Sequence, residues 1–165
     1  MKRFDFTKLM IEMQTRVLKS ATDKRPGKRI LADADEDNIY FCVGGFRLYK
    51  IPRQFCFLDC ARFEHAAVGE IYRKTANLPE ADYMKPAGIV LNKEGDKLVK
   101  FTGTDDRDRP RRVYIQEKFI NEYGGIEHVY VVQERGNRRG PCIVATNYLD
   151  ARLGLVMPVA FNEDC

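Results

Sequence analysis

Residues 113–125 read VYIQEKFINEYGG, and residues 153–161, at the end of the same segment, read LGLVMPVAF. A short helix is predicted over Ile115–Tyr123, because its apolar residues share one side and the pair Gly124-Gly125 stops it. Three apolar, strand-like runs follow, at residues 126–133, 141–146 and 153–161. The chain is therefore predicted to close with a helix and an antiparallel meander, which is typical of an α+β fold.

The first third of the chain also predicts a helix followed by strands. Residues 6–21 place apolar side chains three and four positions apart and polar ones on the other side, as an amphipathic helix does. Three short strands are expected around the acidic turn Asp35-Glu36-Asp37, at residues 29–34, 38–43 and 46–51.

The middle of the chain predicts a second helix, a hairpin and a charged loop. Apolar residues at helical spacing indicate a helix over residues 58–75, which Pro79 keeps from running further. Residues 88–92 and 97–102 are expected to pair as a hairpin. Residues 103–112 alternate Arg with Asp and contain no apolar side chain, so we expect an exposed loop there.

Length and composition fit one domain. The chain has 165 residues, of which 44% are apolar and 32% charged, so we expect a single domain over residues 1–165, with a seam between two halves near residues 77–86. No apolar run approaches the roughly 20 residues that span a bilayer, so we expect no membrane association and a cytoplasmic protein. An odd number of cysteines, 5, gives no paired framework and favours reduced thiols.

Basic residues gather on the outward face of the first helix and in the loop after it. This arrangement suits the phosphates of double-stranded DNA, which cations bind without reading the sequence. A solvated helix surface is the alternative interpretation. The candidate DNA-binding residues are Lys8, Arg16, Lys19, Lys24, Arg25 and Lys28.

We expect no metal site and no cofactor. The acidic turn at residues 33–37 imitates the start of a calcium loop, but Asn38 stands where such a loop needs glycine. Cys56, Cys60 and His65 are close in sequence, yet no second Cys or His cluster completes a set of ligands. The chain also has no Gly-rich phosphate loop and no dinucleotide fingerprint.

Few residues are suited to catalysis, so we expect a protein that is not an enzyme. No local signature supports Cys142 and His128 as a nucleophile and its base. A magnesium-dependent nuclease is an alternative, with Asp105, Asp106 and Asp108 as the densest carboxylates. The arginines between them oppose the binding of a dication.

The two ends of the chain resemble a domain of the DNA sliding clamp family, specifically the bacterial DNA polymerase III beta clamp. Residues 113–121 look like the family's second-helix segment, and residues 141–144 and 155–159 look like its closing strands with their Val-Met-Pro tail. Residues 6–18 and the strands around the acidic turn resemble its opening helix and hairpin. The resemblance covers about two thirds of the chain and is weakest between Pro52 and Pro86.

The resemblance implies a DNA-clamp-like fold, with antiparallel sheets outside and helices packed on one face toward DNA. It implies a replication accessory role like that of a processivity factor, in a homo-oligomeric ring. In bacterial clamps the Met-Pro tail helps to line a pocket for peptides of polymerases and other partners. The residues that match this tail are Leu155, Met157, Pro158 and Val159.

Three departures from the family leave an alternative open. An acidic end at residues 162–165 follows the tail, and the predicted helix at residues 58–75 has no counterpart in the clamp domain. A closed ring contains six such domains, whereas this chain has the length of one. The alternative is a lone module that binds nucleic acid or peptides without forming a ring.

Overall fold

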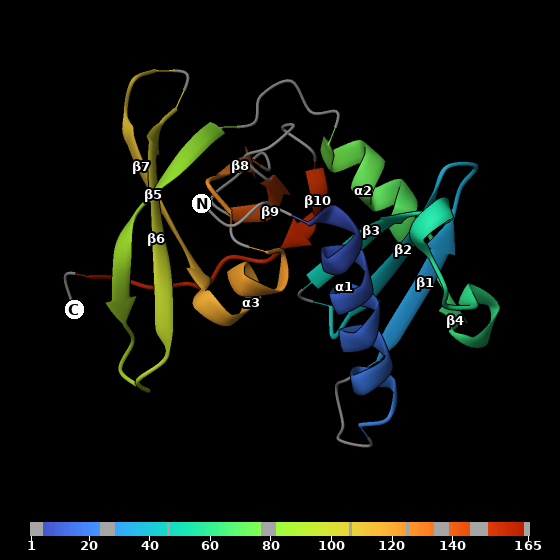
Figure 1. Ribbon diagram of the computed structural model, residues 1–165. Helices are drawn as coiled ribbons and strands as arrows, with labels where there is room; N and C mark the ends of the chain where they lie inside the picture. Colours follow the sequence, from blue (N-terminus) through green and yellow to red (C-terminus); the bar gives the residue numbers. More distant parts are fainter. Residues whose placement is uncertain are drawn as a thin grey trace.

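The computed structural model describes residues 5–23, 29–45, 47–76, 82–105, 107–124, 126–133, 139–145 and 152–163. Within them the chain forms three α-helices and a ten-stranded sheet, which confirms an α+β fold (Figure 1). The helices are α1 (Phe6–Ala21), α2 (Val68–Ala76) and α3 (Glu117–Glu122). The strands are β1 (Ile30–Ala34), β2 (Asn38–Val43), β3 (Arg47–Pro52), β4 (Glu64–His65), β5 (Asp82–Leu91), β6 (Lys97–Thr104), β7 (Pro110–Gln116), β8 (His128–Gln133), β9 (Arg139–Ala145) and β10 (Arg152–Val156).

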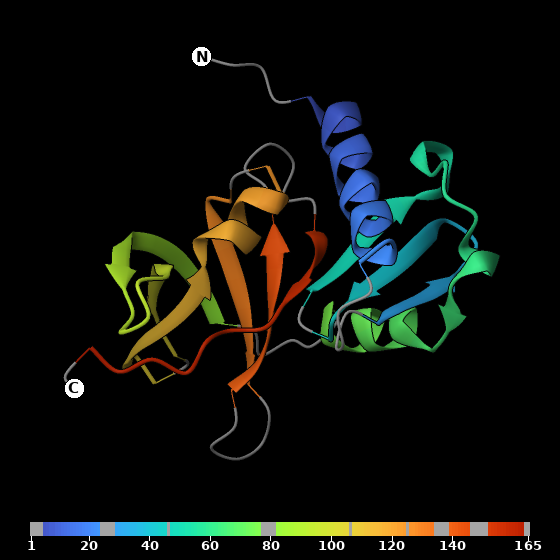
Figure 2. The ribbon, with the colours of Figure 1, turned by 90° about the horizontal axis from the view of Figure 1, so that it is seen from below.

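Two similar units meet at the centre of the sheet. The strands lie in the order β4-β1-β2-β3-β10-β9-β8-β5-β6-β7, so two antiparallel meanders, β1-β2-β3 and β8-β9-β10, join through their last strands. At this seam β3 and β10 run antiparallel, with Leu48 opposite Leu155. Each meander follows a helix, α1 or α3, and both helices lie on the same face of the sheet (Figure 2). The arrangement has an approximate two-fold axis through the seam.

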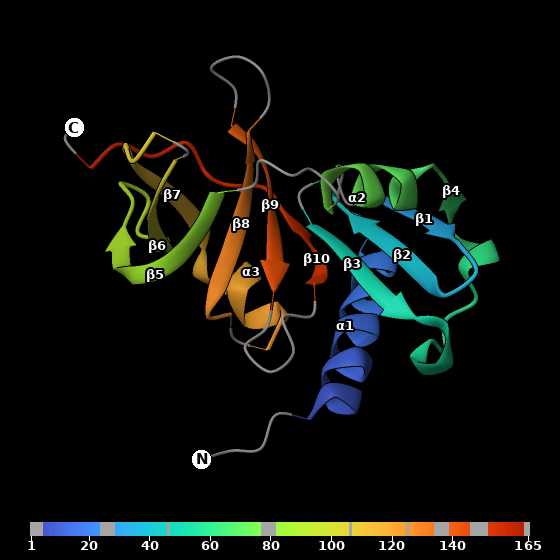
Figure 3. The same ribbon diagram turned by 90° about the horizontal axis from the view of Figure 1, so that it is seen from above.

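The sheet is covered on both faces, which creates two hydrophobic cores. The larger core lies under α1 and α3 and includes Met10, Met13, Phe41 and Tyr123. The smaller core lies on the other face, where α2 packs against β1, β2, β9 and β10 (Figure 3). The alternation of side chains along the strands divides the apolar residues between these two cores.

Strand β5 links the central strands to a hairpin that curls away from them. Residues 82–84 pair with β8, and from Lys85 onward the strand pairs with β6, with an irregularity between Pro86 and Gly88. A bulge of this kind bends a strand. The β6–β7 hairpin then contacts α3, as Figure 1 shows.

The helix predicted over residues 58–75 is wrong in its first half. A 3-10 turn at Cys60–Arg62 and the short strand β4 come first, and α2 begins only at Val68. Leu58 packs against the core under α1, whereas Tyr72 lies in the core under α2. The chain rounds the edge of the sheet here, and one straight helix could not supply apolar residues to both faces.

The exposed loop predicted over residues 103–112 is also wrong in extent. Strand β6 continues to Thr104 and β7 starts at Pro110, which leaves a tight turn between them. Asp105 is 5% exposed, and its carboxylate accepts hydrogen bonds from the backbone N–H groups of Arg107 and Arg109. These bonds satisfy the backbone N–H groups of the turn, so β6 and β7 can pair along nearly their whole length.

Other sequence predictions agree closely with the structure. The first helix has the predicted bounds, and the second of the early strands matches Asn38–Val43. The closing strand is shorter than predicted, because β10 ends at Val156 and Val159 forms only an isolated bridge with Tyr114. The predicted seam at residues 77–86 falls partly on residues 77–81, outside the described part of the chain. Of the helices in the described ranges, none has the length and apolar character needed to cross a membrane.

Candidate functional site

The predicted DNA-binding face is the solvent side of α1. Lys8 and Lys19 are exposed there, and Lys8 lies 3.9 Å from Glu12 one turn later. Arg16 lies at the edge of this side and points toward α3, where it approaches Glu122 at 3.6 Å. The structure therefore brings the three cations onto one helix, with two of them turned to solvent. The other three candidates, Lys24, Arg25 and Lys28, lie outside the described residues.

The opposite edge of the same helix is apolar. Ile11 and Leu18 are 49% and 43% exposed. They are seven residues, or about two turns, apart, so both lie on the same side of the helix. Phe57 is 56% exposed, and its backbone N–H donates to the Gln14 side chain of α1 at 2.7 Å. An exposed apolar edge beside cations suits a protein contact better than a purely electrostatic one.

A buried ionic network lies between α1, α3 and the seam. The Glu122 carboxylate, 7% exposed, accepts hydrogen bonds from Arg47 at 2.6 and 2.7 Å and from the Tyr49 hydroxyl at 2.5 Å. Burial, and then the charge of Glu122, raises the pKa of Tyr49. The Arg47 guanidinium also stacks over Phe119, 4.9 Å from the ring centroid. This network fixes α3 to β3 and leaves the Glu122 charge compensated.

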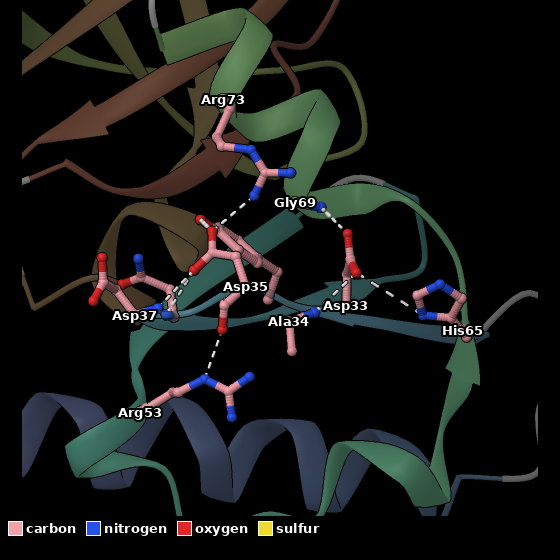
Figure 4. Close-up of polar contacts among 10 residues, drawn as sticks. Asp33, Ala34, Asp35, Asp37, Arg53, His65, Gly69 and Arg73 are labelled. Carbon is pink, nitrogen blue, oxygen red and sulfur yellow. Dashed lines mark hydrogen bonds and ion pairs between the residues drawn. The ribbon is translucent and has the colours of Figure 1, made fainter.

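The acidic turn between β1 and β2 holds α2 in place (Figure 4). The Asp35 carboxylate accepts from the Tyr40 hydroxyl and from Arg73 of α2, each at 2.7 Å. Burial alone would raise the pKa of Asp35, but hydrogen bonds from Tyr40, the turn backbone and Arg73 lower it to about 2. The Asp33 carboxylate accepts from the Gly69 backbone at 2.9 Å. These carboxylates are used for structure, and the described residues contain no group of three or more His, Cys, Asp or Glu side chains that could hold a metal.

Gly69 is required for this close approach of α2. A Cβ atom at that position would lie 2.8 Å from the Tyr40 ring and 2.9 Å from the Asp33 carboxylate. The absence of a side chain therefore lets the N-terminus of α2 reach the acidic turn.

An open pocket of 220 Å³ lies beside the acidic turn. Asp33, Cys60 and His65 line it together with small and apolar residues. His65 Nδ1 lies 3.9 Å from Asp33 Oδ1, which is too long for a hydrogen bond, and the His65 side chain is 80% exposed. Asp33 therefore does not orient this imidazole as the carboxylate of a catalytic triad orients its histidine base.

The predicted peptide-binding residues lie at the end of β10 and in the segment after it, and they do not all line one pocket. Leu155 is 5% exposed in the core under α2, whereas Met157 is 37% exposed. Pro158 and Val159 are half-buried. Val159 N–H donates to the Tyr114 carbonyl at 2.7 Å, which directs the tail across β7.

The rest of the tail is fastened to the β6–β7 hairpin. The rings of Phe161 and Tyr114 meet edge to face at 4.9 Å. Glu163 accepts a hydrogen bond from Lys100 at 2.8 Å and lies 3.5 Å from Arg112. The acidic end that departs from the clamp pattern thus has a structural use in this chain.

The carboxylates of the nuclease alternative are not gathered in the described residues. Asp105 binds the Arg109 side chain at 2.8 and 2.7 Å, and Asp108 has a left-handed backbone with φ 57° at the turn. Asp106 lies outside the described residues. His128 is half-buried on the α2 face of β8, whereas Cys142 is fully buried in the core under α1 and α3, so this pair does not share a face.

One group of surface residues was missed by the sequence reasoning. The rings of Tyr83, His128 and Tyr130 lie together on β5 and β8, with Lys85 and Arg152 beside them. The period-two spacing of Tyr83 with Lys85, and of His128 with Tyr130, is a signal that could have found the group.

The chain matches no protein-family model, no curated protein and no solved structure. Its own geometry therefore carries the functional argument.

Proposed function

We propose that this protein is a non-enzymatic, DNA-clamp-like protein that binds double-stranded DNA through the face formed by α1 and α3. The observation that carries the proposal is the pair of helix-and-meander units related by the approximate two-fold axis at the β3–β10 seam. The second unit is also preceded by a strand, β7, which gives the order strand, helix and further strands of a clamp half. Two helices on one face of a continuous sheet suit a surface that lies along a duplex.

The charges of this face support contact with phosphates. Lys8 and Lys19 lie on the exposed side of α1, and Lys118 is exposed on α3. Each phosphate that a lysine neutralises releases counterions and steepens the salt dependence of binding. Contacts to phosphates carry no sequence information, so the proposed binding is independent of sequence. The proposal includes a replication accessory role, with a partner peptide contacting the exposed Met157 of the tail.

Binding of a fluorescein-labelled duplex, measured by anisotropy over a salt series, tests the DNA contact. Replacing both Lys8 and Lys19 with alanine is expected to weaken binding and to reduce the slope of log K against log salt by about 1.8, at about 0.9 per contact. The matched control replaces Lys93 and Lys97, two exposed lysines at the β5–β6 turn, with alanine. Equal losses in the two double variants would contradict the proposed face.

A lone interaction module without a ring is the second candidate, and the apolar edge of α1 favours it. Exposed Ile11, Leu18 and Phe57 are suited to an apolar partner surface. Light scattering with and without a duplex separates the two candidates. A ring-compatible assembly supports an encircling clamp, whereas a monomer or dimer supports the module.

A further inference from the structure

The aromatic group on β5 and β8 forms a compact platform on the face of the sheet opposite α1 and α3. The ring centroids of Tyr83 and His128 are 4.8 Å apart, those of Tyr83 and Tyr130 5.5 Å, and those of His128 and Tyr130 5.4 Å. Tyr83 is 44% exposed, and His128 and Tyr130 are half-buried. We define these three residues as the aromatic platform.

The strand register explains why the platform stands clear of α2. Tyr83 lies opposite Tyr130, which lies opposite Ile143, which in turn lies opposite Leu155. Ile143 and Leu155 belong to the core that α2 covers, and Tyr130 packs at the border of that core. Tyr83 and Tyr130 therefore continue the same row of side chains beyond the strands β9 and β10 that α2 contacts.

Two cations flank the rings. Lys85 Nζ lies 5.8 Å from the centroid of Tyr83, near the outer limit of a cation–π contact, so the ammonium is loosely held. The Arg152 guanidinium lies over Tyr130 at 5.2 Å and donates one hydrogen bond to the Ala76 carbonyl. A guanidinium has five N–H donors, of which this bond uses one.

We propose that the aromatic platform binds single-stranded nucleic acid. Every nucleobase has a π-face that stacks on Tyr, so binding tolerates any sequence, and lysine or arginine beside the rings contacts the backbone. The cations favour this polyanion over a neutral sugar, which also stacks on aromatic rings. The platform lies on the opposite face from the proposed duplex surface, so the two proposals are independent.

The chain contains no Trp, which permits a direct test. The variant Tyr83→Trp places the sole tryptophan in the platform, where stacking of a base quenches its fluorescence. The probe is an oligothymidine of about 10 nucleotides, within the usual site sizes of such proteins, compared with an abasic strand of equal length. We expect quenching by oligothymidine and much weaker quenching by the abasic strand.

Affinity measurements on the otherwise native chain complete the test. Tyr83→Ala is expected to weaken oligothymidine binding about tenfold, because loss of one base stack has an effect of this order, while Tyr83→Phe keeps most of the affinity. Ile89→Ala, at another exposed position on β5, is the matched control and should change nothing. Lys85→Ala should weaken the binding of oligothymidine and of the abasic oligonucleotide, because Lys85 contacts the backbone that they share.

Three outcomes would overturn the proposal. Equal binding of the abasic strand would show a phosphate site without stacking, and quenching by a neutral oligosaccharide in place of oligothymidine would show a sugar site. Unchanged affinity of Tyr83→Ala for oligothymidine would show that the aromatic platform does not contact the strand. The Lys8 and Lys19 double variant should bind oligothymidine normally, so failure of the duplex proposal leaves this one standing.

Discussion

The two helix-and-meander units reach the same arrangement by different means. In the first unit α1 has 16 residues, an N-cap in which the Asp5 carboxylate accepts from the Lys8 backbone, and its own apolar stripe. In the second unit α3 has 6 residues and no side-chain hydrogen bond at its N-cap, Gln116. A helix as short as α3 is unstable by itself, so tertiary contacts must hold it.

The contacts that hold α3 come largely from outside its own unit. Strands β6 and β7 contact it on one side, and Arg47 of the first unit binds its Glu122. The first unit, by contrast, is covered on both faces by its own helix α1 and by α2. The two units are therefore similar in arrangement but not equally independent, since the second depends on the first.

The first prediction concerns the ion pair between Arg47 of the first unit and Glu122 of the second. Glu122→Ala leaves the Arg47 guanidinium, whose side chain is 18% exposed, without its buried counter-charge, and should lower the free energy of unfolding by about 4 kcal/mol. Urea denaturation measures the loss. The control Glu117→Ala, at a half-buried position on the same helix, should cost no more than about 1 kcal/mol. Similar losses would mean that the network does not hold α3.

The second prediction concerns the pairing of β3 with β10 at Gly154. A Cβ atom at Gly154 would lie 1.8 Å from the Leu48 carbonyl oxygen, so Gly154→Ala must push β10 away from β3. We expect a loss of about 3 kcal/mol in the free energy of unfolding, from thermal or urea melts. Gly45→Ala is the control, because nothing lies within 4 Å of its Cβ position and only its φ of +73° opposes alanine, at about 1 kcal/mol. A smaller loss at Gly154 than at Gly45 would contradict the tight seam.

The third prediction concerns α2, which Arg73 fastens to the acidic turn of the first unit. Asp35→Asn weakens the charged hydrogen bonds from Tyr40 and Arg73 and should cost about 1 kcal/mol. Folding lowers the pKa of Asp35 from 3.8 to about 2, so its stabilisation is complete above pH 3.8 and is lost as pH falls through about 2.

Unfolding measured between pH 7 and pH 2 checks this prediction. The gap between wild type and Asp35→Asn should be constant above about pH 4 and should close toward pH 2. Glu36→Gln, an exposed neighbour in the same turn, should show no such gap. A gap that widens in acid would contradict the assigned role of Asp35.

Local signals predicted the regular elements well. The apolar stripe of residues 6–21 gave the bounds of α1, because burial of one helix face demands that spacing. The segment at residues 58–75 could not be predicted, because its apolar residues serve two cores on opposite faces of the sheet. Periodicity records that a side chain is buried but not on which face.

The candidate site was predictable only where one element carries it. Lys8 and Lys19 share a helix, so their common exposure followed from spacing. The aromatic platform joins β5 and β8, and its formation depends on the register that places Tyr83 opposite Tyr130. The pairing of Glu122 with Arg47 likewise depends on the seam, which no local pattern reveals.

The β3–β10 seam also sets the order of events as the chain leaves the ribosome. The first unit can form its helix and meander early, yet β10, the partner of β3, comes from a distant and later part of the chain, Arg152–Val156. Until then β3 is an unpaired sheet edge, which is a template for pairing with other chains. Contacts between such distant segments close slowly. Folding yield during synthesis should therefore depend on how quickly β10 follows β3 out of the ribosome, and a chaperone that shields β3 would protect the nascent chain at its most aggregation-prone stage.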